Sequence, residues 1–150
     1  MSPAPLPRAP TTVRTGAGAA AFPWLSPRQA MVVLRVTVAG LFLAHALVRI
    51  ASGTIPQFGG FLERAGLPAG VPLVWAITLF ELGGGVLLAV GRATRWMAGG
   101  FCVLLVAGIV LIHRHLGWFV GEHGTGGSEY SVALLAALVT IAANAAPREG

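Results

Sequence analysis

Four apolar runs dominate the sequence, at residues 31–51, 72–90, 95–112 and 130–146. Each holds roughly 17 to 21 residues, and at about 1.5 Å per residue a helix of that length crosses a hydrocarbon core about 30 Å thick. Of the 150 residues, 55% are hydrophobic and 10% are charged. A water-soluble core of this size could not bury so much apolar surface. The sequence therefore predicts an all-α, integral membrane four-helix bundle.

The arginines predict how this bundle is oriented. Around the four runs they divide into a larger group and a smaller one, and glutamates offset only the smaller group. The larger group is Arg8, Arg14, Arg28, Arg92, Arg95 and Arg148, and the smaller is Arg49, Arg64 and Arg114, with Glu63, Glu122 and Glu129. Because cytoplasmic segments carry the excess of arginine, both ends of the chain are expected in the cytoplasm (N-in/C-in). The arginines form no basic stripe, so nucleic-acid binding is not expected.

Segments outside the four runs have distinct compositions. Residues 1–25 are rich in Pro, Ala, Gly and Thr, which predicts a disordered cytoplasmic tail, and residues 147–150 form a short second tail. Ser26 begins the 26–146 domain as a helix N-cap, since Pro and Gln follow at the favoured positions. The 52–70 link predicts a short interfacial helix, with Glu63 and Arg64 toward water. Its apolar side is Phe58, Phe61, Leu62 and Leu67.

Glu81 is the sharpest polar feature, because it lies near the middle of the second run, where an unpaired carboxylate is costly. Arg35, His45 and Arg49 form one polar stripe on the first run when placed on a helical wheel. By depth His45 lies about 6 Å from Glu81 and Arg35 about 9 Å, so the sequence does not choose the partner. These four residues are the candidate intramembrane site. Either they bind a quinone headgroup or handle protons, or they form a structural ion pair that sets helix register.

The second outer segment, residues 113–129, supplies further candidates. Glu129 and Tyr130, with His113, are expected at the outer mouth of the bundle. Histidines in this segment raise the possibility of haem or metal ligation, but their spacing does not support such a site, and no metal is expected. The single cysteine, Cys102, excludes an internal disulfide and a CxxC redox pair.

Four segments in this order resemble the DoxX family: LFLAHALVRI at 41–50, GGFLERAGLP at 59–68, ELGGGVLLAVGRATR at 81–95 and GGSEYSVALLAALV at 126–139. The resemblance implies a small multi-pass protein of the bacterial inner membrane, related to the quinone-linked subunit of thiosulfate oxidation. The family's polar positions correspond to Arg35, His45, Glu81, Glu129 and Tyr130. Arg49 departs from the lysine that is more usual there, and the GEHGTG segment at 121–126 has no counterpart.

These observations lead to a preferred function and two rivals. The preferred one is an accessory subunit that serves an oxidoreductase partner and binds quinone, with no cofactor of its own, because the sequence has no dinucleotide or iron–sulfur motif. The first rival is a small proton-coupled transporter or permeability factor that uses Glu81 and the polar stripe. The second is a non-catalytic membrane scaffold. Lipids are expected partners in each case, and the glycine-rich helix faces suit a homodimer.

Overall fold

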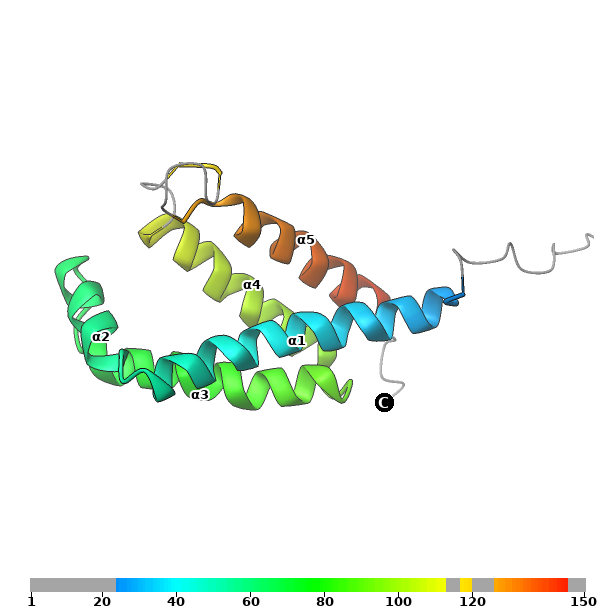
Figure 1. Ribbon diagram of the computed structural model, residues 1–150, viewed down its shortest axis with the longest axis horizontal. Helices are drawn as coiled ribbons and strands as arrows, with labels where there is room; N and C mark the ends of the chain where they lie inside the picture. Colours follow the sequence, from blue (N-terminus) through cyan, green and yellow to red (C-terminus); the bar gives the residue numbers. More distant parts are fainter. Residues whose placement is uncertain (1–23, 113–116, 120–125, 146–150) are drawn as a thin grey trace, which may run out of the picture.

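The computed structural model describes residues 24–112, 117–119 and 126–145, and all regular structure within them is helical. The helices are α1 (Pro27–Ala51), α2 (Ile55–Arg64), α3 (Gly70–Ala89), α4 (Thr94–Leu111) and α5 (Glu129–Asn144). In Figure 1, α1 and α3 lie side by side as one antiparallel pair, and α4 and α5 form another. The α4–α5 pair packs across α1 and diverges from it toward the end that carries α2.

Three of the four predicted membrane crossings are long apolar helices in the structure. α1, α3 and α4 have the length and composition of membrane-spanning segments. α5 is apolar but has only 16 residues, which corresponds to about 24 Å. The second and third predicted spans agree with α3 and α4 to within two residues, whereas α1 begins earlier than its predicted apolar run.

Local hydrogen bonds explain where the helices begin. The Ser26 hydroxyl accepts from the backbone N–H of Gln29, and the Gln29 side chain accepts from the backbone N–H of Ser26, so the predicted cap is confirmed as a reciprocal capping box. α3 begins at Gly70, whose N–H donates to the carboxylate of Glu63 on α2 at 3.0 Å. A side chain of one helix therefore satisfies a free N–H at the start of the next.

The core of the bundle centres on Phe101 of α4, which is fully buried. Its ring stacks on Phe42 of α1, with centroids 4.0 Å apart, and lies at a tilt to Phe80 of α3 at 5.0 Å. Leu134 and Leu138 of α5 belong to the same cluster. In lipid this packing is stabilised by close van der Waals contact rather than by exclusion of water.

The helix that was predicted in the 52–70 link is present as α2. Leu62 is buried in a small second cluster with Ile55 and Val74, while Glu63 and Arg64 are exposed as expected. The chain turns so tightly from α2 into α3 that a Cβ on Gly70 would overlap the carbonyl of Gly59, and glycine makes this close approach possible. α2 is thereby held against the first turns of α3.

Candidate functional site

Glu81 and Arg49 form an ion pair between α3 and α1. One Glu81 oxygen accepts from Nη1 of Arg49 at 2.5 Å, and the other accepts from Nη2 at 3.4 Å. The two side chains are 9% and 13% exposed, respectively. Of the partners that the sequence left open for Glu81, the structure selects Arg49.

Neighbouring groups make further contacts with the guanidinium of Arg49. Nη1 of Arg49 also donates to the hydroxyl of Thr78 at 2.8 Å, and that hydroxyl donates to the carbonyl of Val74 at 2.7 Å. The guanidinium lies 5.5 Å from the ring centroid of Phe58 on α2, a cation–π distance. The pair therefore connects three helices: α1, α2 and α3.

The energetics of a charge in lipid explain why these contacts matter. A single charged side chain at the centre of a membrane helix costs about 2.5–3.5 kcal/mol on insertion scales. Pairing and hydrogen bonding offset that cost only in the geometry in which both charges are satisfied. The contact between Arg49 and Glu81 therefore stabilises one register of α1 against α3.

His45 lies apart from the ion pair, so the structure divides the predicted polar stripe. It follows Val38 by seven residues and so lies on nearly the same face of α1. Val38 is buried in the core, whereas His45 is exposed, since α4 and α5 diverge from α1 in this direction (Figure 1). Within the part of the chain that the structure describes, no hydrogen bond to the His45 side chain is found.

Arg35 lies still further from the pair. It precedes Arg49 by 14 residues, about 21 Å along α1, and its guanidinium packs against Gly91 just after α3. Gly91 has a φ of 77°, and a Cβ there would lie 2.7 Å from Nη1 of Arg35. The backbone therefore favours glycine at this position, and a larger residue would also displace the tip of the Arg35 side chain.

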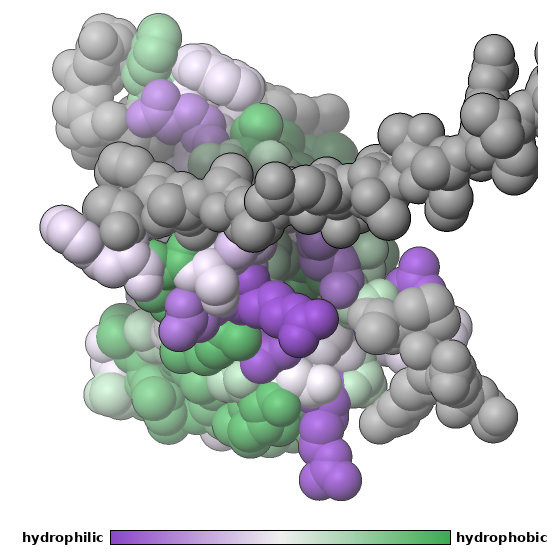
Figure 2. All heavy atoms as spheres, turned by 90° about the vertical axis from the view of Figure 1, so that its right-hand side faces the viewer, coloured by the Kyte–Doolittle hydropathy of each residue, from purple (hydrophilic) through white to green (hydrophobic). Residues whose placement is uncertain are grey.

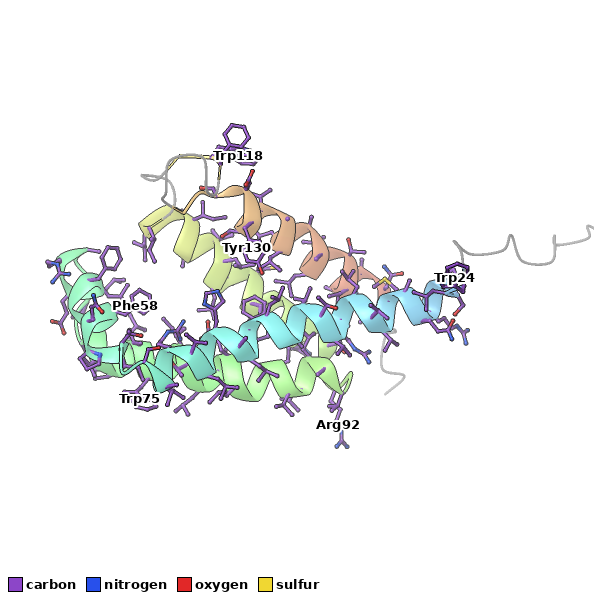
Figure 3. All side chains as sticks on the ribbon, viewed as in Figure 1. Trp24, Phe58, Trp75, Arg92, Trp118 and Tyr130 are labelled. Carbon is purple, nitrogen blue, oxygen red and sulfur yellow. The ribbon has the colours of Figure 1, made fainter. Side chains whose placement is uncertain are left out.

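Residues expected at the outer mouth lie at the start of α5. The N–H of Glu129 donates to the carbonyl of Trp118 at 3.0 Å, and Tyr130 is 44% exposed. Figure 3 shows Trp118 and Tyr130 at this corner, well separated from Phe58 on α2. His113 lies outside the described residues. Among those that are described, no group of three or more His, Cys, Asp or Glu side chains could hold a metal ion.

Sequence reasoning missed three of these contacts and left the partner of Glu81 open, although a signal for that partner existed. Buried positions Ala39, Phe42 and Ala46 on α1 recur at spacings of three and four, and Arg49 is the next position in that series. This spacing places Arg49 on the face that packs against other helices. The contact of Phe58 with Arg49, the cap from Glu63 and the Arg35–Gly91 contact depend on tertiary structure and have no comparable signal.

Helices of this length and composition, joined by a buried Arg–Glu pair, define an integral membrane protein. The DoxX family model matches residues 30–114, which is more than half of the chain, and the protein belongs to the DoxX family. The match includes α1 to α4 almost entirely, and with them both members of the ion pair and His45. No curated protein and no solved structure gave a match.

Proposed function

We propose that this DoxX protein crosses the bacterial inner membrane four times as a helical bundle, with both ends in the cytoplasm. The starts of α1 and α4 and the ends of α3 and α5 gather at one end of the molecule (Figure 1), as an even number of crossings requires. That end carries Arg28, Arg92 and Arg95 without an acidic neighbour among the described residues. The arginine bias favours a cytoplasmic location for it. α5 is near the lower length limit for a span.

The protein's role is that of an accessory subunit for an oxidoreductase. The charges of Arg49 and Glu81 satisfy each other, which suits a structural element better than a catalytic acid or base. Its sequence has no motif for a nucleotide cofactor or an iron–sulfur cluster. Redox chemistry would then be performed by the partner, and this chain would supply a membrane-embedded surface.

The ligand brought to that surface is a quinone, and His45 carries this proposal. A quinone headgroup needs a hydrogen-bond donor that it can reach from the bilayer, and a neutral imidazole has one N–H to donate. His45 is exposed at membrane depth and has no partner among the described residues. It also lies one helical turn from Arg49, whose pairing with Glu81 holds this part of α1 in place.

Quinone binding to the purified full-length protein tests this directly. We expect ubiquinone or menaquinone to co-purify with the wild-type protein and to be lost from His45→Phe, while His45→Asn, which keeps a donor, retains part of it. Arg64→Gln is the matched control, because Arg64 is exposed on α2. Absence of quinone from the wild type, or equal quinone in wild type and His45→Phe, would refute the quinone site.

The oxidoreductase partner is tested separately. A tagged wild-type chain purified from native membranes with mild detergent should bring down a redox enzyme, and deletion of the chain should lower quinone-dependent respiration. If no enzyme co-purifies and vesicles instead show a pH-dependent solute flux that Glu81→Gln abolishes, the proton-coupled transporter is correct. If neither activity responds to changes at these residues, the protein is a scaffold.

A further inference from the structure

A cavity lined mainly by α1, α4 and α5 opens at the arginine-rich end of the molecule. Its volume is about 1220 Å³, and its walls come from the start of α1, the α3–α4 turn, the first turns of α4 and the end of α5. It is distinct from the Arg49–Glu81 pair, neither member of which lines it. In Figure 2, which looks onto this end, hydrophilic side chains gather near the middle of the face among hydrophobic ones.

Three arginines give the cavity a strong positive charge. Arg28 and Arg35 come from α1, and Arg95 comes from α4. The described lining residues include no acidic side chain, and none of the three arginines has a salt bridge within the described part of the chain. Nε of Arg35 is buried and has no hydrogen-bond partner there. A buried donor without a partner is costly, so the cavity is electrostatically suited to an anion.

The start of α4 adds to this preference. Thr94 and Arg95 are in its first turn and line the cavity, and no side chain caps the helix. The first intrahelical bond there is made by the N–H of Met97 to the carbonyl of Ala93, so the N–H groups of residues 94–96 are free of intrahelical partners. Such groups, at the positive end of a helix, favour a phosphate or carboxylate.

The apolar part of the lining points to an anion that belongs to a lipid. Val32, Val103 and Ile141 line the cavity on the side of the spanning helices, next to the open surface at Gly99. Trp96, on the rim, is 82% exposed, as expected of an aromatic side chain at the headgroup level. A molecule that fits this arrangement has a negative head and an apolar tail.

We propose that this cavity is a binding site for an anionic phospholipid of the adjacent leaflet, with its phosphate between Arg28, Arg35 and Arg95 and an acyl chain along α1 and α4. Basic pockets between membrane helices on the cytoplasmic side are suited to such headgroups. The site is independent of the quinone proposal, since it lies about 15 Å along α1 from His45, as measured from Arg35.

Lipid titration of the full-length protein in a neutral detergent tests the proposal. Binding of phosphatidylglycerol and of phosphatidylcholine is measured by native mass spectrometry and by the shift of Tm. We expect phosphatidylglycerol to bind at least tenfold more tightly. Arg35→Gln and Arg95→Gln should each weaken it about fivefold, which corresponds to about 1 kcal/mol per arginine. Arg95 is exposed, so its variant should fold even if that of Arg35 does not.

Two matched controls distinguish an effect at this site from the effects of surface charge elsewhere and of added side-chain volume elsewhere. Arg92→Gln removes an exposed arginine at the same end that does not line the cavity, and should leave lipid binding unchanged. Gly99→Leu should obstruct part of the cavity and weaken lipid binding, whereas Gly83→Leu, at an equally open glycine outside it, should not.

Three results would overturn the proposal. The first is equal binding of the two lipids, and the second is an equal effect of Arg92→Gln and Arg95→Gln. The third is an identical rise of Tm with inorganic phosphate alone at millimolar concentration, which would show a site for a free anion rather than for a lipid.

Discussion

Removing the charge of Glu81 should destabilise the protein by about 3 kcal/mol. Breaking a buried ion pair by removing one partner costs about 3–5 kcal/mol, because the remaining charge stays buried without compensation. Glu81→Gln belongs at the lower end of this range, since the amide oxygen still accepts one bond from Arg49 and Thr78 still accepts another. A loss of 3 kcal/mol is roughly a 150-fold change in the unfolding equilibrium constant.

A double variant distinguishes a coupled pair from two independent residues. Arg49→Met combined with Glu81→Met removes both charges together, and the Thr78 hydroxyl keeps its own bond to the carbonyl of Val74. Replacement of both members of a buried pair by apolar residues is often neutral or stabilising. We expect the double variant to be within about 1 kcal/mol of the wild type, although each single variant is much less stable.

Reversible unfolding of the full-length protein by SDS in mixed micelles, followed by circular dichroism, measures these differences. Arg92→Gln is the control and should change stability by less than about 0.5 kcal/mol, because Arg92 is exposed. If Glu81→Gln behaves like Arg92→Gln, or if the double variant loses the sum of the two single effects, the ion pair does not hold α1 against α3 and the reasoning fails.

Three further substitutions test the local account by the same unfolding measurement. Thr78→Val should cost about 1–2 kcal/mol, because Arg49 loses an acceptor in a buried site; no change would contradict this role of the hydroxyl. Gly91→Ala should cost about 1–2 kcal/mol, because Gly91 has a φ of 77° and the guanidinium of Arg35 can move aside, and Gly53→Ala, with positive φ and open space, should cost a similar amount; a much larger loss at Gly91 would show that Arg35 is fixed in place. Ala69→Gly should stabilise by about 1 kcal/mol, because Ala69 has a φ of 56° before α3, and a loss of stability would count against that strain.

Much of the fold could be predicted from the sequence because lipid imposes simple rules on length and polarity. A run long enough to cross the membrane must satisfy its backbone internally, so it is helical. The Ser26 cap and the α2 helix could also be predicted, because the residues that define each of them are neighbours in the chain. The helix of α5 ends two residues before the apolar run that predicted it, because the run continues past Asn144 with Ala145 and Ala146.

The candidate site was only partly predictable, because the sequence does not define the rotation of α1 about its axis or its register against α3. The sequence identified the face of Glu81 and the three polar residues opposite it, but estimates of depth favoured His45 and Arg35 as partners. Arg35 lies against Gly91, and Leu43 lies against Gly85. These two contacts align α1 with α3 so that His45 lies near the level of Glu81. The rotation of α1 turns His45 away and brings the long side chain of Arg49 to the carboxylate. Such a rotation is set by the packing of all the helices together.

The most direct test of the account is a measurement of topology on intact cells. In a Cys102→Ala background, single cysteines at Gln57 on α2 and at Arg92 after α3 are exposed positions that a membrane-impermeant maleimide can reach from their own side. We predict that Gln57→Cys reacts in intact cells and that Arg92→Cys reacts only after the membrane is opened. Reaction of both from the same side would show that α3 does not cross, and the reverse pattern would contradict the cytoplasmic location of the arginine-rich end.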